Sequence, residues 1–255
     1  MELNTIIVTQ ARMGSTRLPG KIMLEIEGKT LLEIHISRLK KCKEADAILI
    51  ATTVSKKDEI VVEMANKLGV LSFRGSENDV LDRFYQATKP FNPEWVVRVT
   101  SDCPLIDPEL VDQVILYAKN NNFDYCSNVL DEKFPDGQDV EVFKFNALEN
   151  AWTNAVLNSE REHVTPFLRN NVIGKGLSIF KAKNFECDFD YSKIRMTVDE
   201  ELDFELVKYL VKSFGTDKGW REYVKYILDN NLDSINGVIL RNEGYLKSLK
   251  NDKKN

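Results

Sequence analysis

Short apolar runs alternate with longer amphipathic stretches over the first half of the chain. The apolar runs are rich in β-branched residues and bounded by polar ones, which predicts β-strands. These strands are expected at residues 3–9, 47–52, 70–73 and 95–100. Between and after them, apolar residues recur at helical spacing, which predicts amphipathic helices. The helices are expected at residues 31–42, 58–68, 80–88 and 108–119.

This alternation of strand and helix determines the expected fold class. Strands that are apolar throughout, rather than on one side, are typical of a parallel sheet covered by helices on both faces. Successive parallel strands are joined by right-handed crossovers through those helices. We therefore expect an α/β protein, a three-layer α/β/α sandwich with a mostly parallel, mixed sheet.

The pattern weakens after residue 120. Further strands are expected at residues 125–128, 139–143 and 195–198, the first two flanking a turn at 134–137. Further helices are expected at residues 147–156, 161–169 and 200–212, and the chain from residue 220 onward is helical and polar. Because no repeat or linker sets a boundary, we expect one domain over residues 1–215, with a helical C-terminal extension, residues 216–255, packed on it.

Composition and charge narrow the function classes. The chain has 255 residues, 43% of them hydrophobic and 29% charged, which excludes intrinsic disorder over most of its length. Its net charge is -5, which argues against binding a nucleic acid polymer or an anionic membrane by bulk charge. A local basic site remains compatible with that total.

Cysteine usage and hydropathy indicate the compartment. The four cysteines show no paired short spacing, so we expect buried free thiols in a reducing environment. The N-terminus lacks a basic segment before its apolar run, so no secretory signal is visible. No apolar stretch approaches the roughly 18 to 20 residues that span a bilayer. We expect a cytoplasmic protein with no membrane partner.

A basic loop follows the first predicted strand, at the place where open α/β sheets bind ligands. It contains Arg12, Arg17 and Lys21, and no acidic residue occurs between Leu3 and Leu24. Small residues in this loop let backbone N–H groups approach an anion, and the cations can neutralise phosphate oxygens. The loop is therefore predicted to bind a polyphosphate.

Two familiar phosphate motifs do not match this loop. A Walker A motif needs four residues between its glycines, whereas five separate Gly14 from Gly20, and Ile22 follows Lys21 where Ser or Thr is required. A Gly-x-Gly-x-x-Gly fingerprint is also absent from the loop. The alternative is a solvated basic loop. A loop of about 11 residues is longer than the usual 2 to 6 of such connections, which favours a functional role.

Two aspartates are placed to bind a metal ion. Asp102 follows the predicted strand 95–100, and Asp199 ends the predicted strand 195–198. Carboxylates are natural ligands of Mg²⁺, which usually takes one or two of them with substrate phosphates and water. A helix cap explains Asp199 equally well, and Asp102 could stabilise a turn. Asp107, directly before Pro108, is predicted to be only a helix N-cap.

Residues 10–21, Gln-Ala-Arg-Met-Gly-Ser-Thr-Arg-Leu-Pro-Gly-Lys, resemble the signature loop of nucleotidyltransferases with the glycosyltransferase-A type fold. They are most similar to cytidylyltransferases such as the CMP-Kdo and CMP-sialic acid synthetases and the SpsF-like group. The resemblance continues in later segments through residues 243–245. It implies that the loop wraps a triphosphate, and that Ser-Asp-Cys-Pro-Leu-Ile and Arg-Met-Thr-Val-Asp-Glu supply the Mg²⁺ ligands Asp102 and Asp199.

The resemblance also implies roles for further residues. The catalytic residues are expected to be Arg12, Lys21 and Asp102. The nucleotide is expected to contact Gln10, Ala11, Arg12, Gly14, Ser15, Arg17, Lys21, Arg74, Ser76 and Asp102, although a helix cap explains Ser76 equally well. The acceptor is expected to contact Gln138, Asp139, Glu141, Arg161, His163 and Arg195. His163 could act as a general base, but we assign it to substrate binding.

Together these features predict a Mg²⁺-dependent nucleotidyltransferase. The expected reaction transfers CMP from CTP, or another nucleotidyl group from its triphosphate, to a sugar acid, sugar phosphate or similar acceptor with release of pyrophosphate. Surface polysaccharide or glycan biosynthesis is the expected context, and the resemblance implies a homodimer. The alternatives are a glycosyltransferase of the same fold, whose usual Asp-x-Asp motif is absent from the appropriate strand end, and a non-catalytic nucleotide-binding module.

Overall fold

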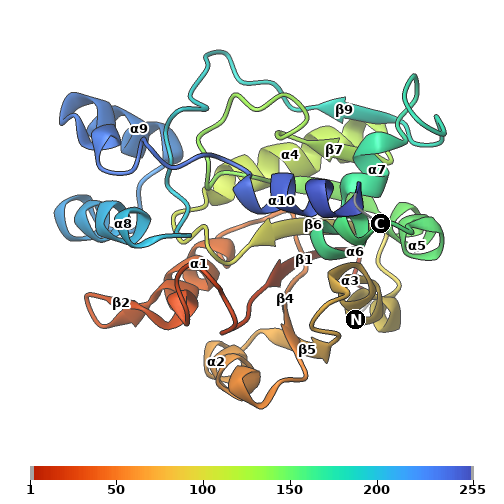
Figure 1. Cartoon of the computed structure of the whole chain (residues 1–255), viewed down its shortest axis with the longest axis horizontal. Helices are drawn as coiled ribbons and strands as arrows, with labels where there is room; N and C mark the ends of the chain where they lie inside the picture. Colours follow the sequence, from red (N-terminus) through yellow and green to blue (C-terminus); the bar gives the residue numbers. More distant parts are fainter. Residues whose placement is uncertain (1–2, 254–255) are drawn as a thin grey trace.

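A seven-stranded sheet with the order β5-β4-β1-β6-β8-β7-β9 forms the centre of the computed structural model, which describes residues 3–253 (Figure 1). β1 (Thr5–Gln10) pairs in parallel with β4 (Ala47–Thr53) on one side and β6 (Trp95–Thr100) on the other. β4 also pairs in parallel with β5 (Leu71–Gly75). Because these four strands are parallel, their C-terminal ends lie along the same edge of the sheet.

The second half of the sheet contains the antiparallel pairing. β8 (Glu141–Lys144) runs antiparallel to β6 and to β7 (Tyr125–Ser127). β7 pairs in parallel with the edge strand β9 (Ala182–Asn184), which the sequence pattern did not predict. The predicted mostly parallel, mixed sheet is confirmed.

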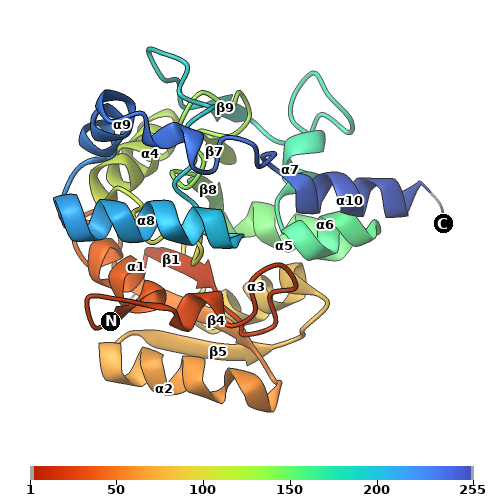
Figure 2. The same cartoon turned by 60° about the vertical axis from the view of Figure 1, so that its left-hand side comes forward.

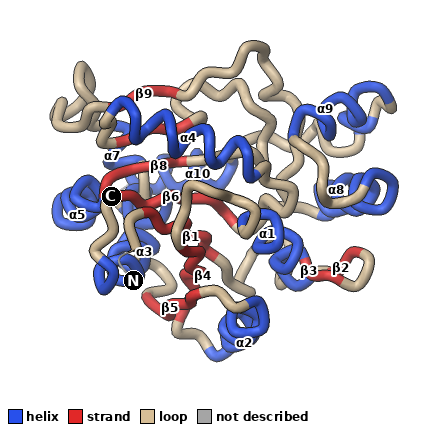
Figure 3. The backbone as a smooth tube through the Cα atoms, turned by 180° about the vertical axis from the view of Figure 1, so that it is seen from behind, coloured by secondary structure: helices blue, strands red, loops and turns tan. Residues whose placement is uncertain are grey.

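Helices cover both faces of the sheet, as Figures 2 and 3 show. One face packs against α1 (Leu31–Leu39), α2 (Glu59–Leu68), α4 (Pro108–Asn121), α8 (Glu201–Phe214) and α9 (Trp220–Asp229). The other face packs against α3 (Val80–Thr88), α5 (Phe145–Asn154) and α7 (Pro166–Asn170). The three-layer α/β/α sandwich is therefore confirmed.

The apolar strands have a simple explanation in this arrangement. Neighbouring residues of one strand point to opposite faces. Ile7 packs in the hydrophobic cluster of the α1 face, whereas Ile6 and Val8 pack in the cluster of the α3 face. All three side chains are fully buried. A strand buried on both sides must be apolar at every position, which is the pattern seen in the sequence.

Short elements complete the chain. A two-stranded hairpin joins β2 (Glu25–Ile26) to β3 (Lys29–Thr30). The remaining helices are α6 (Asn158–His163) and α10 (Glu243–Asp252), with the 3-10 turns η1 (Lys21–Met23), η2 (Lys56–Asp58), η3 (Lys89–Phe91) and η4 (Leu232–Ser234). None of the helices among residues 3–253 is long and apolar enough to cross a membrane. The four cysteines are free, three of them buried.

Two predicted elements are wrong in type or extent. Residues 195–198 form an extended segment with one isolated bridge, between Arg195 and Asp136, because their backbone groups bond to loops rather than to a strand. The predicted helix 161–169 is interrupted between α6 and α7, where Val164 has φ 72° and Pro166 begins the second helix. Proline lacks the N–H that a continuous helix would need.

The C-terminal part of the chain returns across the molecule. α8 and α9 pack on the α1 face, and α10 lies beside α6 on the opposite side (Figure 2). α4 begins at the predicted cap, since Asp107 accepts a hydrogen bond from Glu109 N (2.9 Å) and another from Trp220 N (2.8 Å). That second bond ties the start of α9 to the first half of the chain. The predicted division at residue 215 stays a prediction.

Candidate active site

The C-terminal ends of β1 and β6 lie side by side, because Gln10 is in register with Thr100. Two segments leave the sheet there, the basic loop after β1 and the turn that holds Asp102 after β6. A cleft of about 350 Å³ opens at this edge. It is the place where an open α/β sheet binds its ligand.

The structure brings eleven of the seventeen predicted site residues to the lining of this cleft. They are Gln10, Ala11, Arg12, Ser15, Arg17, Lys21, Asp102, Asp139, Glu141, His163 and Asp199. The other six are not part of the described lining: Gly14, Arg74, Ser76, Gln138, Arg161 and Arg195. We call the part of the cleft around residues 10–22 and Asp199 the loop end. The part around Glu141 and His163 is called the β8 end.

The basic loop is tethered at both ends. Ala11 N donates to Ala51 O (3.2 Å) and Met13 N donates to Asp58 Oδ1 (2.7 Å). Gly20 N donates back to Met13 O (3.1 Å), and this closure needs the positive φ of 68° that Gly20 adopts. The loop therefore returns on itself and starts the short helix η1 with Lys21 at the bottom of the cleft.

Lys21 joins the two predicted metal ligands. Its Nζ donates to Asp102 Oδ2 (2.9 Å) and to Asp199 Oδ1 (2.8 Å). Burial disfavours the charge of Lys21, but the two carboxylates outweigh it and raise the pKa of Lys21 above its ordinary value. Burial likewise opposes the charge of Asp102, yet Lys21 holds the pKa of that carboxyl well below its usual range. Lys21 therefore bridges the two carboxylates.

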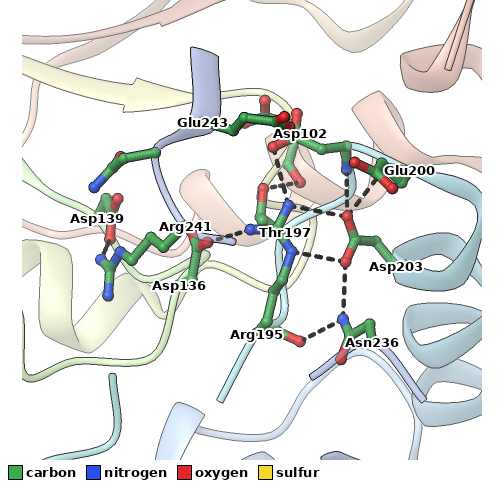
Figure 4. A network of polar contacts seen from close by, with 12 residues as sticks. Asp102, Asp136, Asp139, Arg195, Thr197, Glu200, Asp203, Asn236, Arg241 and Glu243 are labelled. Atoms are coloured by element: carbon green, nitrogen blue, oxygen red, sulfur yellow. Dashed lines mark hydrogen bonds and ion pairs between the residues drawn. The ribbon is translucent and has the colours of Figure 1, made fainter. Parts of the chain in front are cut away.

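Asp199 is held in place by a second network, whose members Arg195, Asp203 and Asp136 are labelled in Figure 4. Arg195 Nη2 donates to Asp199 Oδ2 (3.1 Å), while its Nε donates to Asp203 Oδ1 (2.8 Å) and its Nη1 to Asp136. Asp203 is fully buried and also accepts from Asp199 N (2.9 Å). Arg195 is only 5% exposed and is held by three carboxylates. It therefore has little freedom to move and keeps Asp199 in one orientation.

The segment before Asp199 reaches the site because a glycine leaves room for it. Gly137 has φ 102°, and a side chain there would lie 2.7 Å from the backbone of Met196 and Thr197. The segment then runs beside the turn after β6, where Val198 N donates to Asp102 O (2.7 Å). This contact places Asp199 next to Asp102, although they are far apart in the sequence.

The β8 end contains a second group of charged residues. Glu141 is 2% exposed and accepts from Arg98 Nη1 and from Tyr125 Oη (2.6 Å). Arg169 Nε lies 4.0 Å from the same carboxylate. Asp139 accepts from Arg241 Nη2 (2.7 Å). The carboxylates Glu141 and Asp139 therefore each have an arginine partner.

His163, the last residue of α6, lies at the same end and faces α10. Its Nε2 is 3.1 Å from Ser248 Oγ, and its ring is 5.1 Å from that of Tyr245. Burial lowers the pKa of His163 to about 4. The imidazole is therefore neutral near pH 7, which suits hydrogen bonding to a hydroxyl.

Three predicted site residues outside the lining make internal contacts instead. Gln138 is fully buried and bonds to Leu105 O and Asp107 N (both 2.9 Å). Arg161 donates to Asp79 Oδ2 from two nitrogens and to Trp152 O (2.6 Å). The third is Arg195, described above.

The others lie near β5 and the loop. Arg74 donates to the backbone carbonyls of residues 53–55, and Ser76 Oγ accepts from Asp79 N (3.0 Å) before α3. An added Cβ at Gly14 would be 3.7 Å from Glu77, which is ordinary contact. The capping alternative for Ser76 thus has a matching hydrogen bond.

Several lining residues had no assigned role in the sequence. They are Arg83, Arg98, Arg169, Glu243 and Tyr245. Arg98 carried a usable signal, because it is a charged residue inside the apolar run 95–100. Arg169 carried none, whereas Tyr245 lies in the segment 243–245 to which the sequence resemblance extends, although no role was assigned to it.

The loop end can bind an anion and a cation together. Arg12, Arg17 and Lys21 face the cleft beside Asp102 and Asp199. Within residues 3–253 no group of three or more His, Cys, Asp or Glu side chains is arranged to hold a metal. A cation at this end would therefore use these two carboxylates and complete its coordination with ligand or water oxygens.

The fold and this site define an α/β nucleotide-binding enzyme, and the comparisons with known proteins agree. Residues 6–229 match the family model described as "Cytidylyltransferase". The chain is 44% identical to an uncharacterized protein of Methanocaldococcus jannaschii over 215 residues (83% of this chain, 85% of that protein). It is 32% identical to the spore coat polysaccharide biosynthesis protein SpsF of Bacillus subtilis over 219 residues (82% and 87%).

Solved structures lead to the same result. A cytidylyltransferase from Leptospira borgpetersenii superposes with a TM-score of 0.83 at 33% identity, over 92% of this chain and 96% of that chain. A CMP:2-keto-3-deoxy-manno-octonic acid synthetase complexed with CTP shares the fold, with a TM-score of 0.60 at 18% identity (82% and 98% covered). The chain belongs to the cytidylyltransferase family and is a nucleotidyltransferase.

Proposed function

We propose that this protein is a Mg²⁺-dependent cytidylyltransferase that transfers CMP from CTP to a sugar acid, sugar phosphate or similar acceptor, with release of pyrophosphate. The observation that carries the proposal is the position of Lys21 between Asp102 and Asp199, below a loop with two further cations. The three cations of the loop suit the negative charge of a triphosphate, and the two carboxylates suit a divalent cation. The acceptor's attacking oxygen would approach from the β8 end.

Asp102 and Asp199 fit a divalent cation. One carboxylate oxygen of each lies within 2.9 Å of Lys21 Nζ, so the two groups converge on one cation, while Asp199 also pairs with Arg17 and Arg195. Mg²⁺ usually takes one or two carboxylates together with substrate phosphates and water. When bound, Mg²⁺ would neutralise charge on the α-phosphate and on the leaving pyrophosphate.

The loop residues would bind and orient the triphosphate. Arg17 Nη2 donates to Asp199 Oδ1 (2.8 Å), and Arg12 Nη1 lies 3.9 Å from Glu77 Oε1. These cations would exchange their carboxylate partners for phosphate oxygens when the nucleotide binds. Lys21 would make the same exchange and leave both aspartates to the metal. Phosphoryl chemistry of this kind depends mainly on positioning and charge, so little further help is required.

The names of related proteins support the acceptor class and the context. SpsF of Bacillus subtilis is named for spore coat polysaccharide biosynthesis. A 3-deoxy-manno-octulosonate cytidylyltransferase of Elusimicrobium minutum is 33% identical over 121 residues, 47% of each chain. We therefore propose a role in the synthesis of a surface polysaccharide or glycan. The homodimer and the cytoplasmic location stay predictions, to be tested by light scattering and cell fractionation.

The test has two stages. Thermal shift with CTP, UTP, GTP, ATP and dTTP, each with Mg²⁺, identifies the nucleotide, and CTP is expected to give the largest stabilisation. Pyrophosphate release is then measured with CTP and a panel of sugar acids and sugar phosphates. Release that requires both CTP and an acceptor supports the proposal. Release of a sugar from a nucleotide-sugar donor, or no turnover despite CTP binding, would contradict it.

A further inference from the structure

The wall of the cleft at its β8 end includes a segment outside the family match. That match ends at residue 229, yet Asn242, Glu243, Gly244 and Tyr245 line the cleft. We call residues 241–248 the C-terminal wall. Its position beside α6 makes it part of the site, although the family model does not include it.

Polar contacts along its length fix the C-terminal wall to the rest of the cleft. Arg241 donates to Phe134 O (3.0 Å) and to Asp139 Oδ1 (2.7 Å). At the other end, Ser248 Oγ donates to Glu162 Oε2 (2.5 Å) and lies 3.1 Å from His163 Nε2. The wall is therefore held to both sides of the β8 end.

Between these two sets of contacts, the ring of Tyr245 packs against Arg169, whose Nε has no hydrogen-bond partner among the described residues. The ring centroid of Tyr245 is 5.3 Å from Arg169 Cζ. Arg169 Nε is buried and makes no hydrogen bond in the described part of the chain. Its contact with Glu141 is long, at 4.0 Å, because Arg98 and Tyr125 already occupy that carboxylate.

The carboxylates nearest Arg169 are each hydrogen-bonded to a group other than Arg169. Arg98 and Arg169 share the single carboxylate of Glu141, and Asp139 is paired with Arg241. Of the groups that α6 contributes, Glu162 bonds to Ser248 and His163 is neutral near pH 7. The Arg169 side chain is 22% exposed and makes no charge-assisted hydrogen bond among the described residues, so an anionic ligand could supply one.

We propose that Arg169 and Tyr245 form a subsite for an anionic group of the acceptor, a carboxylate or a phosphate, and that the C-terminal wall completes it. This inference rests on the proposed function. A guanidinium binds either anion through two parallel N–H···O bonds, and the tyrosine face holds the guanidinium in one plane. The subsite would thus orient the acceptor toward the nucleotide at the loop end.

The first test compares Arg169→Met and Arg169→Lys with wild type, using the best acceptor from the pyrophosphate-release panel. Loss of a charge-assisted contact is expected to raise the acceptor KM in Arg169→Met roughly 100-fold. The KM for CTP should not change, and Arg169→Lys should recover part of the acceptor affinity. Arg221→Met is the matched control, because Arg221 also stacks on an aromatic ring but is 55% exposed and outside the described lining.

The second test locates the wall's contribution. Tyr245→Leu keeps an apolar side chain but removes the aromatic face, and should raise the acceptor KM roughly tenfold with CTP binding unchanged. A neutral acceptor as the best substrate, or an acceptor KM that Arg169→Met leaves unchanged, would overturn the inference. Comparing sugar acids with sugar phosphates shows which anion the subsite accepts.

A third measurement does not need turnover. Phenylglyoxal modification of Arg169 in the full chain, followed by mass spectrometry, is repeated with potassium acetate and with inorganic phosphate. Protection of Arg169 but not of Arg221 supports the subsite, and the more protective anion identifies the group. No protection by either anion contradicts the subsite even if CMP transfer is observed. Protection without any transfer would instead leave the subsite standing and contradict the proposed function.

Discussion

At the loop end of the cleft, three cations, Arg12, Arg17 and Lys21, come from one continuous segment, whereas at the β8 end the arginines come from three separate elements. Arg98 lies on β6, Arg169 on α7 and Arg241 before α10. The loop end is therefore a local motif whose residues stay together by chain connectivity. The β8 end exists only because the chain folds, which is why its residues were harder to recognise.

The two ends also differ in how their charges are compensated. At the loop end, the cations already hold carboxylates that a ligand and a metal would take over, since Lys21 bridges Asp102 and Asp199. At the β8 end, Arg169 has no comparable partner. Ligand binding thus requires an exchange of partners at the first end and only an addition at the second.

The largest effect is expected from Asp102→Asn. This change removes one of two carboxylates at the loop end while keeping its shape, so kcat should fall by about 1000-fold, the loss associated with one preorganised polar contact in a transition state. CTP affinity measured without metal should change much less. Asp188→Asn, at a carboxylate that is 81% exposed, is the control. Full activity in Asp102→Asn would exclude Asp102 as a metal ligand.

Lys21→Met tests the exchange of partners directly. In the free protein Lys21 occupies the two carboxylates, so Mn²⁺ should bind weakly until CTP draws the lysine away. Removing that charge should raise the Mn²⁺ affinity of the nucleotide-free protein by roughly tenfold, as expected for one nearby charge. Electron paramagnetic resonance of free Mn²⁺ measures this. Equal Mn²⁺ affinity in the two proteins would show that Lys21 does not compete with the metal.

Acid is expected to lower the free energy of unfolding through a buried histidine next to the loop end. His35 Nδ1 donates to Cys103 O (2.9 Å) and its Nε2 accepts from Thr9 Oγ1 (3.0 Å), which ties β1 to the turn of Asp102. Burial lowers the pKa of His35 from 6.5 to about 4. Between these values the unfolded chain binds a proton that the folded chain does not, so the free energy of unfolding falls as pH falls, by up to about 3 kcal/mol.

Urea denaturation at pH 7.5 and pH 5 measures this dependence. His35→Gln should reduce the difference between the two values, because glutamine does not titrate. His163 shifts in the same direction, and His163→Gln is therefore measured in parallel to separate the two contributions. The same loss of stability in both variants as in wild type would assign the pH dependence to other groups.

The smallest effect on catalysis is expected from Arg161→Met. The sequence placed Arg161 in the acceptor site, but in the structure it bonds to Asp79 and Trp152 O. Its loss should lower the free energy of unfolding by about 1 kcal/mol and leave both KM values unchanged. Thermal denaturation and steady-state kinetics test the two parts. A raised acceptor KM in Arg161→Met would show that Arg161 contributes to acceptor binding after all.

Particular residues show how much of the site the sequence could predict. Lys21 and Asp102 follow buried strands, and a polar residue at the C-terminal end of a parallel strand lies at the ligand edge in any fold of this class. The predicted metal role of Asp199 was reached from a strand that does not form, since residues 195–198 are extended beside a loop. Its position depends on Gly137 and on Arg195, which no local pattern reveals.

Apolar periodicity and charge within short segments predicted six of the seven strands of the central sheet, the two helical layers and the basic loop at the end of β1, but not β9. The placement of Lys21 between Asp102 and Asp199, and of Tyr245 against Arg169, follows from the folded chain and not from local patterns. These contacts join residues that are 76 or more positions apart in the chain. Such pairs are selected by packing and charge in the folded state, so the pattern of neighbouring residues does not encode them.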